Sequence, residues 1–207
     1  CSSDLFQAKG WRVKGYTAIL LAVGQDARGR ETPVLLDKIV ARFAAVRAEV
    51  GRAVDVALDL HGHLGPALVH RLLPLLAPHD PLFVADPCSP GNSHVLAALA
   101  AGGTVPLATG ARCPSRAAFR DLLRAGGVAV LQPGVTTAGG ISETRRIAEI
   151  AALDDVAVAL HHTGGPIGLA ASLQVAASVP NFLVQEHPGL TNKWDLGQGF
   201  LLNPFTL

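Results

Sequence analysis

Residues 54–65, VDVALDLHGHLG, determine the architecture that we expect for this chain. An apolar run ends at Asp59, and His61 follows two residues later. A buried strand of a parallel sheet has this pattern, because apolar side chains fill both faces and polar groups gather where the chain leaves the core. Side chains alternate along a strand, so Asp59 and His61 are expected on one side of it. The stretch therefore predicts a strand whose carboxyl end carries chemistry; alternatively, Asp59 caps the next helix and His61 is an ordinary loop residue.

The same unit, a short apolar strand followed by a helix, recurs along the chain. Strands are expected at residues 16–23, 54–60, 81–86, 105–109, 128–132, 156–160 and 182–185. Helices are expected at residues 33–50, 66–76, 93–101, 115–124, 141–152 and 167–177, with the end of a further helix before Gly15. Strands that alternate with helices form parallel βαβ units with right-handed crossovers.

Two architectures contain this repeat, an open doubly wound sheet and a TIM-like barrel. No glycine-rich dinucleotide fingerprint follows the first strand, which disfavours a nucleotide-binding open sheet. Polar side chains instead follow almost every predicted strand. The mouth of a barrel needs such a ring of groups, whereas an open sheet concentrates its site at one switch point. The strand-end residues are Asp59, His61, Asp86, Thr109, Gln132, His161, His162 and Glu186. The sequence therefore predicts a (β/α) barrel.

Composition limits the class of protein. A chain of 207 residues fills one α/β core, and 49% hydrophobic against 16% charged residues is too apolar for disorder. The net charge of +1 gives no electrostatic basis for binding nucleic acid or an anionic membrane. No apolar run approaches the roughly 20 residues that span a bilayer. Three unclustered cysteines fit a reducing, cytoplasmic setting. The chain starts at Cys1 and contains no methionine, which fits a fragment of a longer product.

Four stretches carry a resemblance to a known family: DLHGHLGPA at 59–67, PLFVADPCSPGN at 81–92, residues 105–151 from VPLATGARCP to RRIAEIA, and residues 158–186 from VALHHTGGP to FLVQE. The chain resembles the barrel domain of the enolase superfamily. Within that superfamily it is most similar to the mandelate racemase subgroup and its acid-sugar dehydratases of the galactonate type. The likeness extends over residues 15–186, in the same order and spacing.

The resemblance implies a two-domain enzyme with an N-terminal α+β cap and a (β/α)7β barrel. Nothing in the sequence corresponds to the cap or to the first barrel strand. We therefore expect a single, incomplete barrel domain over residues 1–207, with residues 187–207 as a tail. An incomplete barrel exposes unpaired strand edges, which proteins normally cover. A homo-oligomer or a partner segment is expected to cover them here.

The resemblance also implies one Mg²⁺ held by three carboxylates, which stabilises the enediolate formed when a base removes the α-proton of a carboxylate substrate. Only Asp59 is kept, because Ala85 and Ala111 occupy the other two ligand positions. Asp86 lies beside a lost ligand, but strand alternation points it away from the mouth unless a bulge turns it inward. Weak or absent Mg²⁺ binding is therefore expected. A softer ion such as Zn²⁺, held by Asp59 with His61, His161 or Glu186, is an alternative that no spacing rule supports.

The catalytic residues implied by the resemblance are partly kept. His61 matches the general acid of the dehydratases, His161 matches the general base, and Glu186 matches the carboxylate at the end of the last strand. The aspartate that orients the base falls on Gly134, and a strand-end lysine is replaced by Leu20. The predicted substrate pocket is completed by Thr109, Arg112 and Gln132. His162 is expected on the opposite face of its strand, packed or at the surface. Loop or helix-surface positions are expected for His63, His70, His79, His94 and His187.

Two functional hypotheses stay open. The first is an enzyme with lyase- or isomerase-type acid–base chemistry by His61 and His161, acting on a small hydroxylated or carboxylate substrate with little or no Mg²⁺ dependence. The second is a catalytically inactive relative that serves as a binding or assembly module. The retained histidine pair favours the first, and the substitutions at the metal and orienting positions favour the second.

Overall fold

The computed structural model describes residues 8, 10, 15–23, 31–187 and 201–203. Within these residues, seven parallel strands alternate with six α-helices, as in a TIM-like barrel that has fewer strands than the complete form. This confirms the predicted fold class. The chain divides into two compact units, described separately below. Unit 1 comprises Cys1–Thr109 and Ala125–Val128, and unit 2 comprises Gly110–Arg124 and Ala129–Leu207. The proposed helix end before Gly15 and most of the tail lie outside the described residues.

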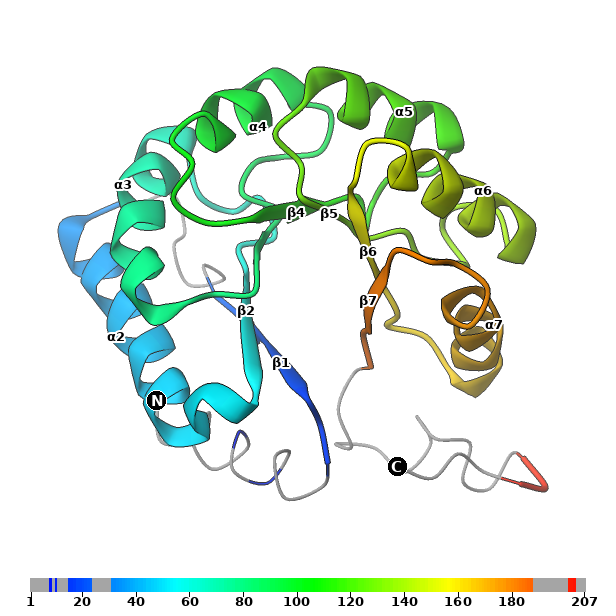
Figure 1. Ribbon diagram of the computed structural model, residues 1–207. Coiled ribbons are helices and arrows are strands. Elements are labelled where there is room, and N and C mark those ends of the chain that lie inside the picture. Colours follow the sequence, from blue (N-terminus) through cyan, green and yellow to red (C-terminus); the bar gives the residue numbers. More distant parts are fainter. Residues whose placement is uncertain (1–7, 9, 11–14, 24–30, 188–200, 204–207) are drawn as a thin grey trace. The chain divides into compact units, whose positions relative to one another are not determined.

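Unit 1 contains the first four strands and three helices. They are β1 (Ala18–Ala22), α2 (Pro33–Val50), β2 (Asp55–Asp59), α3 (Pro66–Leu76), β3 (Val84–Ala85), α4 (Ser93–Ala100) and β4 (Leu107–Thr109). The strands pair in chain order, and the register places Asp59 beside Ala85 and Ala85 beside Ala108. The helices lie along one side of these strands (Figure 1). The strand ends that carry the predicted site residues are therefore neighbours.

Local sequence explains why these helices begin where they do. The Thr32 hydroxyl accepts a hydrogen bond from the Leu35 N–H at the start of α2, and Pro33 occupies its first turn. Pro66 takes the same first-turn position in α3. The buried stripe of α2 includes Phe43 and packs in the core of unit 1.

Unit 2 contains the remaining helices and strands. They are α5 (Arg116–Ala125), β5 (Val130–Leu131), α6 (Ile141–Ala152), β6 (Ala157–Leu160), α7 (Pro166–Ala176) and β7 (Phe182–Gln185). Both strand pairs are parallel, and a register shift lies between Val158 and Ala159 where β6 pairs with β7. The core includes Phe119, Ile147 and Leu160, all fully buried. β5 and β6 are shorter than the predicted strands 128–132 and 156–160, whereas β7 has the predicted bounds 182–185.

Gly110 begins unit 2 directly after β4. Its φ of +117° lies in a region that side chains rarely adopt, and an added Cβ would lie 2.5 Å from the Phe119 ring. Only glycine fits this turn, which places Ala111 and Arg112 in the following loop. No helix among the described residues is long and apolar enough to cross a membrane.

Candidate functional site

The first group of predicted site residues lies at the end of β2 in unit 1. The His61 N–H donates to Asp59 Oδ1 at 2.8 Å, and His61 Nδ1 lies 3.1 Å from Asp59 Oδ2. One carboxylate thus contacts both the backbone and the ring of the same histidine. His61 has a φ of +52°, which is uncommon for a residue other than glycine. This turn lets the imidazole fold back onto Asp59 while its side chain stays 40% exposed.

Asp86 and Thr109 form a second contact in unit 1, between the ends of β3 and β4. The Thr109 hydroxyl donates to Asp86 Oδ1 at 2.7 Å. Asp86 is only 5% exposed and has a φ of +43°. A buried carboxylate requires hydrogen-bond donors, and Thr109 is one of them. The hydroxyl of Thr109, which the sequence predicted as a substrate-pocket residue, is bonded to Asp86, and its role in a pocket stays a prediction.

The three positions at which the resemblance implies carboxylate ligands for Mg²⁺ are occupied by Asp59, Ala85 and Ala111. Ala85 pairs in register with Asp59, so a methyl group stands where the second carboxylate would be, and it is 1% exposed. Ala111 replaces the third. In the part of the chain that the structure describes, no group of three histidine, cysteine, aspartate or glutamate residues is arranged to hold a metal ion.

The second group lies in unit 2, at the ends of β6 and β7. His161 Nδ1 lies 2.5 Å from Glu186 Oε2, and the His162 N–H donates to the same oxygen at 3.3 Å. The side chains of His161 and Glu186 are 24% and 23% exposed, so the pair is reachable from solvent but partly shielded. A hydrogen bond from the Glu186 N–H to Leu160 O, at 2.9 Å, holds the two strand ends together.

His162 is packed inside unit 2, which agrees with one of the two placements expected for it. It is 5% exposed, and an added Cβ at Gly168 would lie only 3.0 Å from His162 Cε1, so this glycine makes room for the ring. Its Nε2 is buried without a hydrogen-bond partner. Burial lowers the pKa of His162, and nearby His187 lowers it further. His187, expected as a loop or helix-surface residue, lies in the loop after β7 and is half-buried.

Gly134 lies against the opposite edge of the His161 ring. An added Cβ at this position would lie 3.5 Å from His161 Cδ2 and 3.3 Å from His161 O. The φ of Gly134 lies outside the left-handed region, so an added side chain would meet no strain from φ, but its Cβ would crowd the His161 carbonyl oxygen. Position 134 therefore faces the ring, as the resemblance implies, but supplies no carboxylate.

The other two predicted pocket residues, Gln132 and Arg112, differ in burial. Gln132, after β5, is 4% exposed, and its Oε1 is buried without a hydrogen-bond partner. Arg112 is exposed in the loop after β4, and Leu20 lies within β1, partly buried. The structure thus joins Asp59 to His61 and Asp86 to Thr109 in unit 1, and His161 to Glu186 in unit 2.

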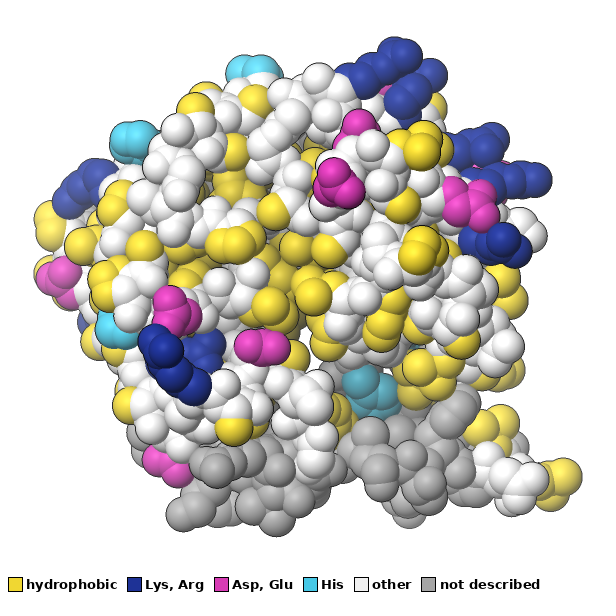
Figure 2. Space-filling model, viewed as in Figure 1, with side chains coloured by type: hydrophobic (Ala, Val, Ile, Leu, Met, Phe, Trp, Pro, Cys, Tyr) yellow, Lys and Arg dark blue, Asp and Glu magenta, His cyan; other side chains and the backbone are white. Residues whose placement is uncertain are grey.

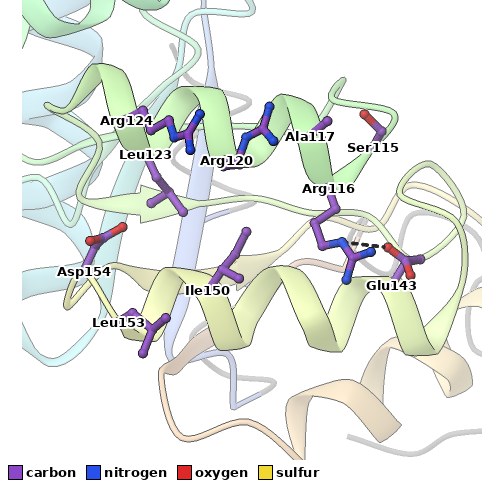
Figure 3. A pocket seen from close by; sticks show the side chains of 10 residues that line it. All are labelled: Ser115, Arg116, Ala117, Arg120, Leu123, Arg124, Glu143, Ile150, Leu153 and Asp154. Carbon is purple, nitrogen blue, oxygen red and sulfur yellow. Dashed lines mark ion pairs between the residues drawn. The ribbon is translucent and has the colours of Figure 1, made fainter.

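Sequence analysis missed a groove between α5 and α6. It encloses about 770 Å³, with an ion pair of 3.5 Å between Arg116 and Glu143 at one end and Leu153 and Asp154 at the other (Figure 3). Basic side chains gather over these two helices (Figure 2). The spacing of Arg116, Arg120 and Arg124, which places them on one face of a helix, is the sequence pattern that could have indicated this groove. The groove lies between helices, and no predicted site residue lines it.

Comparison with known proteins gives one family. A family model described as "Enolase C-terminal domain-like" matches residues 5–206. D-galactonate dehydratase of Variovorax paradoxus (strain S110) is 42% identical over 156 residues, which are 75% of this chain and 41% of that protein. The enzyme of the same name from Xanthomonas oryzae pv. oryzae (strain PXO99A) is 35% identical over 180 residues, 87% of this chain and 47% of that protein. The chain spans less than half the length of these curated relatives.

Solved structures agree with the sequence comparison. A mandelate racemase/muconate lactonizing enzyme-like protein from Rubrobacter xylanophilus has a TM-score of 0.87 and 31% identity, covering 92% of this chain and 50% of that one. An enolase from Agrobacterium radiobacter, with bound Na and L-malate, has a TM-score of 0.81 and 31% identity, covering 90% and 49%.

Proposed function

Because the chain belongs to the enolase C-terminal domain-like family, we propose that it performs lyase- or isomerase-type acid–base chemistry on a small hydroxylated carboxylate. Sugar acids are the first substrate class to consider, since the curated relatives are named D-galactonate dehydratases. The chain spans less than half of those proteins, so their activity as a whole is part of the proposal.

The contact between His161 and Glu186 is the observation that carries this proposal. An imidazole held by a carboxylate at 2.5 Å and still 24% exposed has the properties of a general base. In the proposed elimination, His161 accepts the proton from the carbon next to the substrate carboxylate. The electron pair of that C–H bond forms the new C=C bond.

His61 is the proposed general acid. It gives its proton to the β-hydroxyl, which leaves as water, so the proton removed and the hydroxyl expelled are both accounted for. Asp59, at 3.1 Å from the His61 ring, holds the imidazole in place for this step. A racemisation or isomerisation would use the same proton removal without loss of the hydroxyl.

Little or no Mg²⁺ dependence is the second part of the proposal. The alanines at positions 85 and 111 remove two of the three carboxylates implied by the family. Losing a single preorganised charge stabiliser typically slows a reaction by about 10²–10³-fold. We therefore propose slow proton removal, or a substrate whose α-proton is more acidic than that of a simple sugar acid.

Proton–deuterium exchange tests the proposal directly. The chain is incubated in D₂O with D-galactonate and a panel of other sugar acids and hydroxy acids, and exchange at the α-carbon is followed by proton NMR. We expect exchange with the unaltered chain, its loss in His161→Ala, and no change in His70→Ala, a control at an exposed position of α3. Equal exchange in all three proteins would contradict the role of His161.

The substitutions at positions 85, 111 and 134 favour a second candidate, a catalytically inactive relative that binds a small molecule. Such a protein gains stability from a ligand that binds only its folded form, but exchanges no proton. A rise in Tm with one of the acids, without deuterium incorporation, would support this function over the first.

A further inference from the structure

We infer that Glu186 is the positioning residue of His161: it holds the ring proton on Nδ1 and so makes Nε2 the atom that accepts the substrate proton. The assignment of Nε2 to proton removal rests on the proposed function. The contact itself, and the tautomer that it selects, do not depend on that function.

Strand register brings the two residues together. Val158 pairs with Phe182, but after the register shift Ala159 pairs with Val184 and Leu160 with Gln185. Leu183 is the extra residue of this irregularity. Without this extra residue, the pairing that starts at Val158 and Phe182 would continue in step along both strands. Gln185, not Glu186, would then lie beside His161. The shift therefore aligns the carboxylate with the imidazole.

Neighbouring hydrogen bonds fix this end of β7. Gln185 Nε2 donates to Leu160 O at 3.2 Å and to Glu186 O at 2.8 Å. The buried Ser172 hydroxyl of α7 donates to Gln185 Oε1 at 2.7 Å. Because the Gln185 side chain is bonded at both ends, the backbone of Glu186 is held beside β6. The His162 N–H gives the carboxylate oxygen a further donor.

The orientation of the His161 ring follows from where the carboxylate stands. Its Nδ1 edge faces Glu186, and its Cδ2 edge faces Gly134. A half-turn of the ring would exchange Nδ1 and Cδ2 and present Nδ1 to position 134. Because Nδ1 stands beside the Glu186 carboxylate, which accepts a hydrogen bond, the ring N–H points toward Glu186. The carboxylate from β7 thus does for His161 what a carboxylate at position 134 would do.

The chemical consequence is a defined proton position. An ionised carboxylate accepts only, so the Nδ1 beside it carries the proton, and the lone pair lies on Nε2. When Nε2 takes a proton, the imidazolium forms next to Glu186, which stabilises it and stays ionised. No proton has to pass to Glu186.

Nitrogen NMR of the whole chain, with ¹⁵N-labelled histidine, tests this inference. Ring ¹⁵N shifts report which nitrogen carries the proton. We expect His161 to be protonated on Nδ1 in the unaltered chain and to lose this preference in Glu186→Ala. Adding Gly134→Asp to Glu186→Ala should restore the Nδ1-protonated form, because the new carboxylate faces the same ring. Glu149→Ala, at an exposed position of α6, is the matched control and should change nothing.

Glu186→Gln separates the hydrogen bond from the charge and covers the case in which the alanine variant does not fold. Its amide oxygen still accepts from Nδ1, so the tautomer should persist, while deuterium exchange with any active acid should fall at least tenfold. An unchanged tautomer in a folded Glu186→Ala, or no tautomer preference in the unaltered chain, would overturn the inference. If no acid exchanges, the proposed function fails, but the tautomer measurements still decide whether Glu186 positions His161.

Discussion

At the scale of single residues, three histidines in similar sequence surroundings have different environments. His61 folds back onto Asp59, His161 contacts Glu186, and His162 is packed against glycine. His161 and His162 directly follow β6, where the first side chain contacts Glu186 and the second packs against glycine. A carboxylate partner and partial exposure mark the two that are suited to proton transfer.

The buried His162 makes stability depend on pH. Burial lowers its pKa in the folded chain below the ordinary value of 6.5, so the unfolded chain binds more protons as the pH falls through 6.5. The free energy of unfolding should therefore fall below about pH 6.5, with at most about 1.4 kcal/mol per pH unit from this residue. Urea denaturation between pH 7.5 and pH 5 measures it. His162→Gln should flatten the slope, and His94→Gln, at an exposed position, should not; equal slopes in all three proteins would contradict the assignment.

At the scale of elements, helix α7 and strand β7 together position the Glu186 carboxylate beside His161. Helix α7 supplies Ser172, which orients Gln185, and β7 then presents Glu186 to the end of β6. The register irregularity between β6 and β7 is part of the same arrangement. A helix, a strand and a bulge together place one carboxylate.

Removing the Ser172 hydroxyl should therefore destabilise unit 2. In Ser172→Ala, the Gln185 side chain loses a buried hydrogen-bond donor, which typically costs about 1–3 kcal/mol. The urea midpoint should fall accordingly, whereas Ser142→Ala, an exposed serine of α6, should leave it within about 0.5 kcal/mol. A Ser172→Ala protein as stable as the parent would show that the contact does not hold β7.

At the scale of the whole molecule, the chain keeps the strand–helix order of its family, and the loss of two metal carboxylates at Ala85 and Ala111 stays a prediction. Among the described strands, β1 and β7 are the edge strands of the sheet, because β1 pairs with β2 and β7 pairs with β6. Phe182 and Leu183 of β7 are 38% and 39% exposed. A homo-oligomer or partner segment that covers the sheet edges stays a prediction, as does a cytoplasmic location. Sedimentation of the purified chain measures its oligomeric state and so tests the predicted homo-oligomer.

Magnesium should have little effect on global stability. A ligand that binds only the folded state raises the free energy of unfolding when its concentration exceeds its Kd, and one carboxylate at Asp59 is a weak Mg²⁺ ligand. We expect about 10 mM Mg²⁺ to leave the Tm unchanged to within about one degree, equally in Asp59→Asn. A rise of several degrees that Asp59→Asn abolishes would show that the chain holds the ion after all.

The sequence by itself determined the repeated parallel strands and helices, the family, and most of the polar residues at the strand ends. These follow from apolar periodicity, helix-start residues and a shared order of motifs, which depend on residues close together in the chain. The pairs Asp86–Thr109 and His161–Glu186 are 23 and 25 residues apart, and only the tertiary structure decided them. Strand register sets such contacts, and a shift of one residue exchanges Gln185 for Glu186. The ring orientation of His161 depends on that shift, so no local pattern contained it.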